Sequence, residues 1–164
     1  MIVRPAREED REAIGIIFCR GWQDAYKGII DQEYLDTLTP QAAQPKNINP
    51  EITYVCQTGE EVIGVVNFGI ARQENDPELG EIRAIYVLPE RQGQGAGSLM
   101  FKKAQNLLQD RGYKGFILWS LLGNQLSHDF YIKMGMSKTD RIKNYKIANK
   151  DYPSCQFEYH FDKE

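Results

Sequence analysis

The sequence predicts a mixed α/β fold over residues 1–164, read as one domain, with a largely antiparallel sheet, a central parallel strand pair and helices on both faces. Three observations lead to this prediction. Apolar patterning changes along the chain in the order β-α-α-β-β-β-α-β-α-β-β. One helical pattern separates two apolar runs, 79–88 and 116–119, which predicts that these two strands are parallel. No repeat, linker or composition shift marks a second domain.

The first third of the chain alternates between short strand and helix signals. Residues 2–4 are β-like, and Pro5 ends that strand or places it at an edge. A helical face then extends from Glu8 to a stop at Gly28, with the apolar positions Ile14, Ile17, Phe18, Gly21, Trp22 and Ala25. Asp31 is a good N-cap for a short helix over 32–38. Residues 39–50 lack an apolar period, and we expect a loop that shapes a substrate mouth.

The remaining elements follow from period and turn signals. Strands are expected at 52–57 and 62–71, joined as a hairpin, and at 79–88 after the polar connection 72–78. A helix over 99–108 ends at Gly112 and leads to a buried strand at 116–119. A helix over 125–134, with Leu126, Phe130 and Met134 on its apolar face, precedes two closing strands at 136–147 and 152–161, joined by residues 148–151.

Composition excludes several classes of function. A net charge of −3 without a basic block argues against nucleic-acid binding. No apolar run approaches the roughly 20 residues that span a bilayer, and charges follow Met1 too closely for a signal peptide. Cys19, Cys56 and Cys155 lack metal-ligand spacing, so we expect reduced, structural thiols, a cytoplasmic protein and no metal.

A glycine-rich turn between the strand 79–88 and the helix 99–108 is the main functional signal. Gly93, Gly95 and Gly97 let the backbone bend tightly and let a ligand approach bare amides at a helix start, which is an anion cradle. A phosphate-binding P-loop would need Lys before Ser98. A dinucleotide fingerprint would need Gly at position 98 and an acidic residue after the next strand, and 113–127 contains none. A glycine turn without a ligand is the remaining alternative.

The segment Gln92-Gly93-Gln94-Gly95-Ala96-Gly97 resembles the coenzyme A pyrophosphate signature of the GCN5-related N-acetyltransferases (GNAT). A second motif of that family is matched downstream by Asn124 and by the segment 130–136, in which Met136 stands where Phe is usual. The opening residues 4–10 and the segment 22–35 are similar to its bacterial small-molecule members. The resemblance therefore covers nearly the whole chain.

The resemblance implies an acetyl-CoA-dependent N-acetyltransferase that transfers acetyl directly to a primary amine of a small molecule or peptide. The parallel pair would splay around acetyl-CoA, with backbone groups of Ile85, Tyr86 and Val87 along the pantetheine arm. The pyrophosphate would lie on the amides of residues 92–97, assisted by the Gln92 side chain. Asn124 would bond the pantetheine, or would simply cap the following helix. A homodimer through the terminal strands is plausible from the family.

Direct transfer needs no covalent enzyme intermediate, and no Ser–His or Cys–His pair is apparent in the sequence. Tyr131 is the candidate general acid for the leaving thiolate, with a packing role as its alternative. Glu81 is the candidate base, through a water. Its alternative is a surface salt bridge to Arg83, which lies on the same strand face. Asp76 and Glu78 are further candidates for the base.

Two aromatic residues of the first helix, Trp22 and Tyr26, are spaced to line the acceptor pocket or to pack in the core. His128 is expected to face solvent. A rival hypothesis keeps the fold and removes catalysis, leaving an acyl-CoA-binding sensor or interaction module. Turnover of acetyl-CoA across a panel of amines separates the two.

Overall fold

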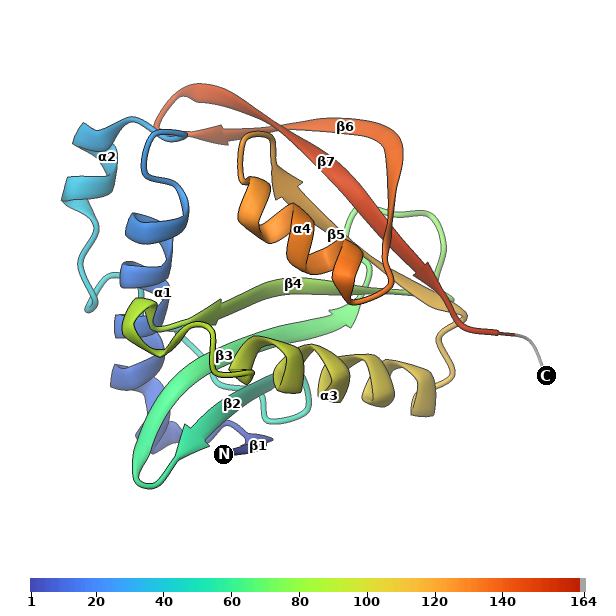
Figure 1. Cartoon of the computed structure of the whole chain (residues 1–164), viewed down its shortest axis with the longest axis horizontal. Helices are drawn as coiled ribbons and strands as arrows, with labels where there is room; N and C mark the ends of the chain where they lie inside the picture. Colours follow the sequence, from blue (N-terminus) through green and yellow to red (C-terminus); the bar gives the residue numbers. More distant parts are fainter. Residues whose placement is uncertain (163–164) are drawn as a thin grey trace. The chain divides into compact units, whose positions relative to one another are not determined.

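The computed structural model describes residues 1–162, and its elements follow the predicted order (Figure 1). They are β1 (Ile2–Pro5), η1 (Glu8–Asp10), α1 (Arg11–Ala25), α2 (Gln32–Thr37), β2 (Thr53–Thr58), β3 (Glu61–Ile70), β4 (Leu79–Val87), η2 (Pro89–Arg91), α3 (Ala96–Asp110), β5 (Gly115–Leu121), α4 (Gln125–Lys133), β6 (Ser137–Ile147) and β7 (Lys150–His160). The predicted bounds therefore hold to within a few residues for nearly every element.

The strands form one seven-stranded sheet with the order β1-β2-β3-β4-β5-β7-β6. The β1–β2, β2–β3, β5–β7 and β6–β7 pairs are antiparallel. The β4–β5 pair is parallel, in register at Leu79–Gly115, Gly80–Phe116 and Glu81–Ile117. The predicted fold class, a mixed and largely antiparallel sheet with one parallel pair, is confirmed.

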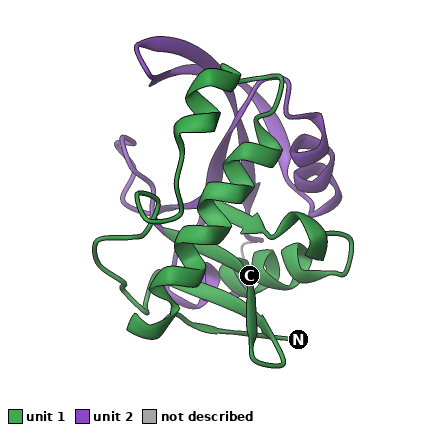
Figure 2. Cartoon of the chain, turned by 90° about the vertical axis from the view of Figure 1, so that its left-hand side faces the viewer, with its two compact units in different colours: residues 1–68, 84–105 green, residues 69–83, 106–164 purple. Residues whose placement is uncertain are grey.

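The chain divides into two compact units (Figure 2). Unit 1 consists of residues 1–68 and 84–105, and unit 2 contains residues 69–83 and the described chain from residue 106 onward. The chain crosses from one unit to the other inside β3, β4 and α3. Because each unit is assembled from separate segments, neither matches a sequence-continuous domain, and the single domain over 1–164 stays a prediction.

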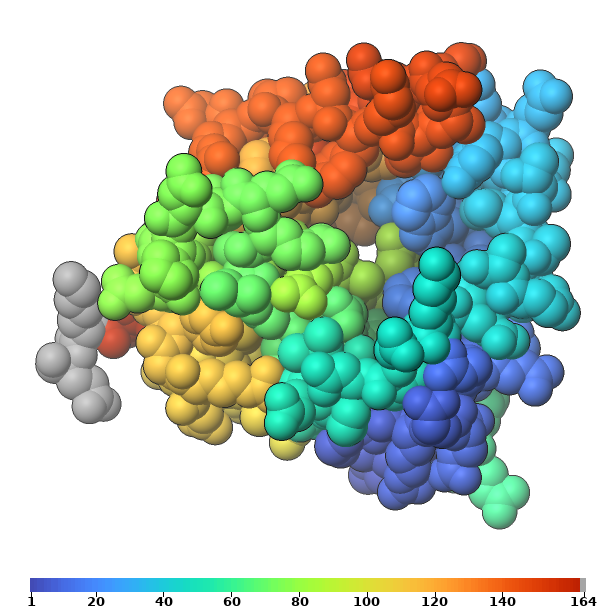
Figure 3. Space-filling model, turned by 180° about the vertical axis from the view of Figure 1, so that it is seen from behind, coloured from blue at the N-terminus to red at the C-terminus, as the bar shows by residue number. Residues whose placement is uncertain are grey.

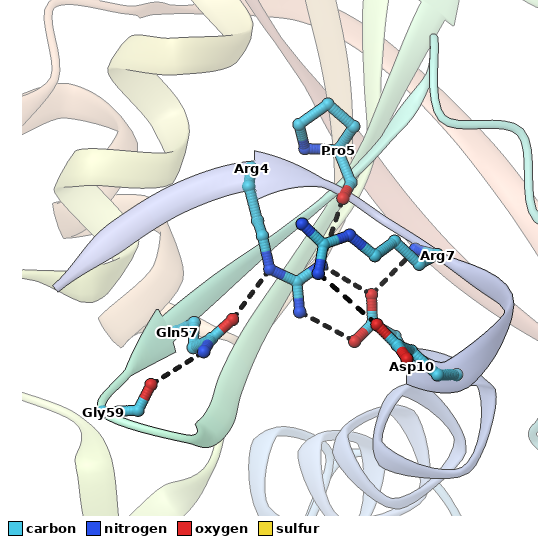
Figure 4. A network of polar contacts seen from close by, with 7 residues as sticks. Arg4, Pro5, Arg7, Asp10, Gln57 and Gly59 are labelled. Atoms are coloured by element: carbon cyan, nitrogen blue, oxygen red, sulfur yellow. Dashed lines mark hydrogen bonds and ion pairs between the residues drawn. The ribbon is translucent and has the colours of Figure 1, made fainter.

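In unit 1, one buried network fixes the start of α1 to the sheet. Arg4 of β1 donates two hydrogen bonds to the Asp10 carboxylate, at 2.8 and 2.9 Å, and the Arg7 backbone N–H donates a third at 2.7 Å. Arg4 Nε also donates to the side chain of Gln57 in β2 at 2.7 Å (Figure 4). Asp10 is only 4% exposed, so this carboxylate depends on its partners.

The core of unit 2 lies between α4 and the strands β5 and β7, which α4 lies alongside in Figure 1. Phe116, Leu118, Cys155 and Phe157 are fully or almost fully buried there. The β6–β7 hairpin closes with a two-residue turn, Ala148 and Asn149, both at positive φ. The predicted four-residue connection was therefore wrong, because these residues adopt the left-handed turn geometry that matches strand twist.

The predicted apolar face of α4 was also wrong. Leu126 is 85% exposed, whereas His128, which was expected to face solvent, is buried. The His128 ring packs against Phe157 at 5.2 Å between centroids, and its Nε2 lies 3.1 Å from the Leu121 carbonyl oxygen. A hydrogen-bonded imidazole can occupy a core position that apolar spacing alone assigns to leucine.

Candidate active site

The glycine turn is built as a backbone cradle at the start of α3. Gly93 and Gly95 adopt φ of +76° and +91°, a region that side chains disfavour, and nothing lies within 4 Å of where a Cβ would be. α3 begins at Ala96, so the first amides of the helix have no partner within it. The helix dipole adds partial positive charge at this end. The open side of this turn therefore fits an anion held by backbone N–H groups.

The Gln92 side chain is exposed and only loosely held. Its amide nitrogen lies 3.5 Å from both Asp24 Oδ2 and the Val87 carbonyl oxygen, at the outer limit of a hydrogen bond. A neighbouring ion pair ties the turn to α1, because Arg20 donates to both oxygens of Glu90 at 2.8 and 2.6 Å. The turn is thus anchored while the Gln92 amide can turn to a ligand.

The end of β4 packs against α1 through Tyr86. A Cβ on Gly21 would lie 2.8 Å from the Tyr86 ring, so only glycine allows this approach. The Tyr86 and Tyr26 hydroxyls are 3.0 Å apart, and the Phe18 ring meets Tyr86 edge-on at 5.7 Å. Burial raises the pKa of Tyr26, opposed by its hydrogen bond to Tyr86. The structure therefore joins a predicted acceptor residue, Tyr26, to the strand end predicted to bind the cofactor.

A cavity of about 250 Å³ opens on unit 1 between α1 and the connection after α2. Its lining is apolar and aromatic, made by Phe18, Cys19, Trp22, Leu38 and Ala43. Trp22 lines this cavity, and Tyr26 contacts the Trp22 ring edge-on at 5.0 Å. Burial raises the pKa of the Cys19 thiol, so this thiol contributes an uncharged group to the lining of the cavity. Ala43 comes from the loop 39–50, which the sequence assigned to a substrate mouth, whereas no spacing rule singled out Leu38.

The loop wall of this cavity is held on α1 by direct contacts. A Cβ on Gly15 would collide with the Pro40 carbonyl oxygen, so the backbone of the loop lies directly on the helix. Arg11 donates to the Pro45 carbonyl, and Gln23 donates to the Leu35 carbonyl at 3.1 Å. The connection between α2 and β2, cyan in Figure 3, lies on the molecular surface. The cavity is therefore preformed.

The structure overturns the salt-bridge interpretation of Glu81. It is 3% exposed, so it is not part of a surface salt bridge. Its partner is Arg72, whose backbone N–H donates to Oε1 at 2.9 Å and whose guanidinium donates to Oε2 at 3.1 Å. Arg83 instead donates to the Ile70 carbonyl at 2.9 Å, so the predicted pairing was wrong. The pattern failed because the connection after β3 brings Arg72 back onto β4.

The alternative bases lie at the other end of that connection. Asp76 pairs with Lys114 at 2.5 Å, and Glu78 lies 3.8 Å from the same ammonium group. The ion pair with Lys114 lowers the pKa of Asp76. Both carboxylates therefore lie beside Lys114, much as Glu81 lies beside Arg72.

Asn124 and Tyr131 lie at opposite ends of α4. Asn124 occupies the N-cap position without a side-chain capping bond, while its carbonyl accepts from the His128 N–H at 3.1 Å. Tyr131 is half-buried, with its ring against Phe157 at 5.4 Å and against Phe130 at 5.7 Å. The Tyr131 ring therefore has the packing role named above as the alternative. These ring contacts do not involve the hydroxyl, which is the group that a general acid would use.

A Cys–His contact that the sequence did not reveal lies beneath α4. Cys155 Sγ is 3.8 Å from His128 Nε2, and both residues are buried. Burial raises the pKa of the Cys155 thiol and lowers the pKa of His128, so both groups are neutral. A neutral thiol is a poor nucleophile, and this contact is part of the core.

Three further features concern the described residues as a whole. Within residues 1–162, no group of His, Cys, Asp and Glu side chains is arranged to hold a metal ion. No helix in the same part of the chain combines the length and apolar character needed to cross a membrane. The three cysteines are all buried and free.

Comparisons with known proteins agree with this geometry. Residues 7–136 match the model of the Acetyltransferase (GNAT) family. The uncharacterized N-acetyltransferase YuaI of Bacillus subtilis is 32% identical over 125 residues, covering 74% of this chain and 72% of the relative. PaiA N-acetyltransferase from Thermoplasma acidophilum, solved in complex with coenzyme A, superposes with a TM-score of 0.71 at 17% identity over 98% of both chains.

The structure of yncA from Salmonella typhimurium with its cofactor acetyl-CoA gives a TM-score of 0.71 at 18% identity, covering 100% of this chain and 95% of the other. These neighbours hold coenzyme A and acetyl-CoA, the cofactor predicted from the sequence. The predicted fold and the predicted enzyme class are confirmed. The chain belongs to the GNAT acetyltransferase family, and it is an N-acetyltransferase.

Proposed function

We propose that the chain binds acetyl-CoA at the turn 92–97 and transfers its acetyl group directly to a primary amine. The observation that carries the proposal is the pair of left-handed glycines, Gly93 and Gly95, which leaves an open cradle of amides at the start of α3. Gln92 contributes its loosely held side-chain amide. The backbone of Ile85, Tyr86 and Val87 pairs with the pantetheine arm as an added strand would, and Asn124 bonds it with its side-chain amide.

The chemistry requires two proton movements. Acetyl-CoA supplies a thioester whose carbonyl carbon is attacked by the amine nitrogen, so that a C–N bond forms and the C–S bond breaks. Tyr131 gives its phenolic proton to the departing sulfur. Glu81 takes the proton that the amine loses, through a water. Atoms and charges balance without a covalent enzyme intermediate.

The acceptor is a small molecule or peptide that carries an apolar group beside its amine. The aromatic and aliphatic lining of the cavity at Trp22 supports this proposal, because such surfaces favour apolar ligands. A cavity of about 150 Å³ already admits benzene, so about 250 Å³ accommodates a phenyl-sized group with part of its linker. Tyr26 supports the Trp22 ring.

We further propose a cytoplasmic enzyme that forms a homodimer. Three buried free thiols suit a reducing compartment. β6 ends the strand order of the sheet, so its outer edge is available for pairing with a second copy. Light scattering at several protein concentrations measures the dimer directly.

Thermal unfolding with and without coenzyme A tests the cofactor site. Saturating coenzyme A raises Tm, since binding to the folded state alone stabilises it. Gly95→Leu should abolish most of that rise. The matched control is Gly59→Leu, because Gly59 also has a positive φ and open space around its Cβ position, in the β2–β3 turn.

Both substitutions place a leucine at a positive φ with open space around its Cβ, so the comparison concerns the ligand effect on Tm within each variant. An undiminished Tm rise in the Gly95 variant would contradict the assigned cradle. Coenzyme A binding without acetyl release to any amine would instead favour the acyl-CoA-binding module that lacks catalysis.

A further inference from the structure

Among the described residues, unit 2 contains three buried side-chain donors without a hydrogen-bond partner, and two of them lie on directly opposed strand positions. Trp119 of β5 and Gln156 of β7 are directly opposed in the antiparallel register, so their side chains project from the same face. Trp119 Nε1 and Gln156 Nε2 are both buried and have no hydrogen-bond partner. Gln156 is only 3% exposed. Orphaned buried donors are uncommon in folded proteins, and two side by side require an explanation.

The Gln156 amide oxygen is bonded by Thr139 of β6. Thr139 Oγ1 donates to Gln156 Oε1 at 3.1 Å and accepts from the Arg141 backbone N–H at 3.2 Å. The amide oxygen is therefore satisfied, and the NH₂ group is directed elsewhere. The two orphan groups on this face are thus both donors, so the missing partner is an acceptor.

Two cations of β6 lie over the same indole ring. The Lys143 ammonium is 5.0 Å from the Trp119 ring centroid, and the Arg141 guanidinium carbon is 5.4 Å from it. Arg141 is neutralised by Glu74 at 3.1 Å. Glu158, the carboxylate next to Gln156 on this face, lies 3.4 Å from His160. Of the two cations over the indole, Lys143 is therefore the one without a carboxylate partner among residues 1–162.

We propose that this face binds a carboxylate. A carboxylate has two acceptor oxygens in one plane, which matches two donors presented from directly opposed strand positions. Its negative charge is matched by the Lys143 ammonium, which lies over the indole. We name the site defined by Trp119, Gln156 and Lys143 the donor pair site. Its assignment rests on contacts within unit 2 and does not depend on the proposed acetyl transfer.

Side-chain movement gives the ligand access. The atoms that cover the indole belong to Lys143 and Arg141, which are long and flexible, and the Lys143 ammonium also lies 5.0 Å from the Tyr145 ring. An incoming carboxylate attracts the Lys143 ammonium away from the Trp119 and Tyr145 rings. The carboxylate then lies where the ammonium was and accepts from Trp119 Nε1 and Gln156 Nε2. Binding therefore changes the surroundings of the Trp119 indole.

The chain offers an optical test because it contains only two tryptophans. In Trp22→Phe, the indole of Trp119 is the single reporter. Sodium butyrate should change its emission saturably, and butyramide, which has nearly the same size without the charge, should not. Sodium chloride at equal concentration controls for ionic strength.

Matched variants locate the effect. Lys143→Gln in the single-tryptophan background should weaken butyrate binding about tenfold, the usual effect of losing one charged hydrogen bond. Lys146→Gln removes the same charge from the exposed neighbouring stretch of β6 and should leave binding unchanged. Gln156→Met removes the orphan donor and keeps the approximate shape of the side chain, so it should reduce butyrate binding. It also removes the hydrogen bond from Thr139, so Tm without ligand is recorded alongside.

Equal responses to butyrate, butyramide and chloride would overturn the proposal, as would an unchanged affinity in Lys143→Gln. Amine kinetics then identify the source of the carboxylate. Competition of butyrate with the amine places the carboxylate on the acceptor, and noncompetitive behaviour places it on a separate effector. Since the fluorescence titration needs no turnover, failed acetyl transfer and a failed donor pair site remain distinguishable.

Discussion

At the scale of single residues, Tyr131 combines observed ring packing with the general-acid role that we propose for its hydroxyl. Its ring lies against Phe157 and Phe130 within unit 2, which fixes the direction of the phenol. A fixed phenol loses little conformational freedom when it donates a proton, and positioning of that kind is what general acid catalysis needs. Removing only the hydroxyl therefore separates the two roles.

Tyr131→Phe should lower kcat about a hundredfold, the lower range for loss of a general acid. The dissociation constant of coenzyme A and the melting temperature should stay close to wild type, because the ring contacts remain. Steady-state thiol release at saturating acetyl-CoA measures the effect. Tyr113→Phe, also half-buried in the wild type, is the control. Full activity in Tyr131→Phe would leave the residue with a packing role alone.

Glu81 poses a second question at this scale, because Arg72 already bonds both carboxylate oxygens. If Glu81 is the base, Glu81→Gln lowers kcat/KM and removes the rise of activity with pH, while Arg72→Gln keeps that rise. Rate profiles over pH for both variants, with Tm recorded alongside, decide this. If both variants lose the same amount of Tm and of activity, the role of Glu81 is to hold the β3–β4 connection through Arg72, and it is not the base.

At the scale of elements, α1 carries most of the acceptor site that we propose in unit 1. Its residues Phe18, Cys19 and Trp22 form one wall of the cavity, and Tyr26 at its end contacts Tyr86. The position of the helix is set at its start by the Arg4–Asp10 ion pair and along its length by Gly15 and Gly21. Small residues on one helix face therefore determine how closely the aromatic residues approach the sheet and the loop.

Asp10→Asn should destabilise the protein by about 2–3 kcal/mol at neutral pH, since it leaves the mostly buried Arg4 without a counter-charge. Urea unfolding measures this. Glu9→Gln, which removes an exposed partner of Arg7, should cost less than about 0.5 kcal/mol. An equal cost for both variants would contradict the anchoring role of Asp10.

The same carboxylate gives a pH dependence. Burial acts to raise the pKa of Asp10, but the bonds from Arg4 and Arg7 outweigh it and lower the pKa below 3.8. A lowered folded-state pKa stabilises the protein fully above 3.8, and this contribution is lost as the pH falls below that value. The stability difference between wild type and Asp10→Asn should therefore shrink in acid.

At the scale of the whole molecule, the element order was predictable because it depends on local signals. The ends of elements are marked by changes in the apolar period, by Pro89 and by the glycines at 28, 112 and 135. The parallel β4–β5 pair is predicted by the helix α3, which lies between these two strands in the sequence. The glycine turn was predictable for the same reason. Its chemistry resides in the backbone and in consecutive residues.

What the sequence did not reveal depends on contacts between distant segments. The partner of Glu81 is Arg72 because of the path of the chain after β3. His128 is buried because β7 presents Cys155 and Phe157 to α4. The cavity joins α1 to residues 38 and 43, where the loop has no period to interpret. The partners of these side chains could therefore be identified only from the structure, whereas the cofactor signature could be identified from the sequence.

We expect the enzyme as a whole to prefer acceptor amines that carry an apolar group. Phenethylamine should show a KM at least tenfold lower than ethylamine, because burying a phenyl group contributes about 2 kcal/mol. Ala43→Phe fills the cavity and should remove that preference while coenzyme A binding and transfer to ethylamine persist. Ala42→Phe adds the same ring to the exposed neighbouring position and should change neither KM. Loss of both amines in Ala43→Phe, or equal KM values in the wild type, would place acceptor recognition elsewhere.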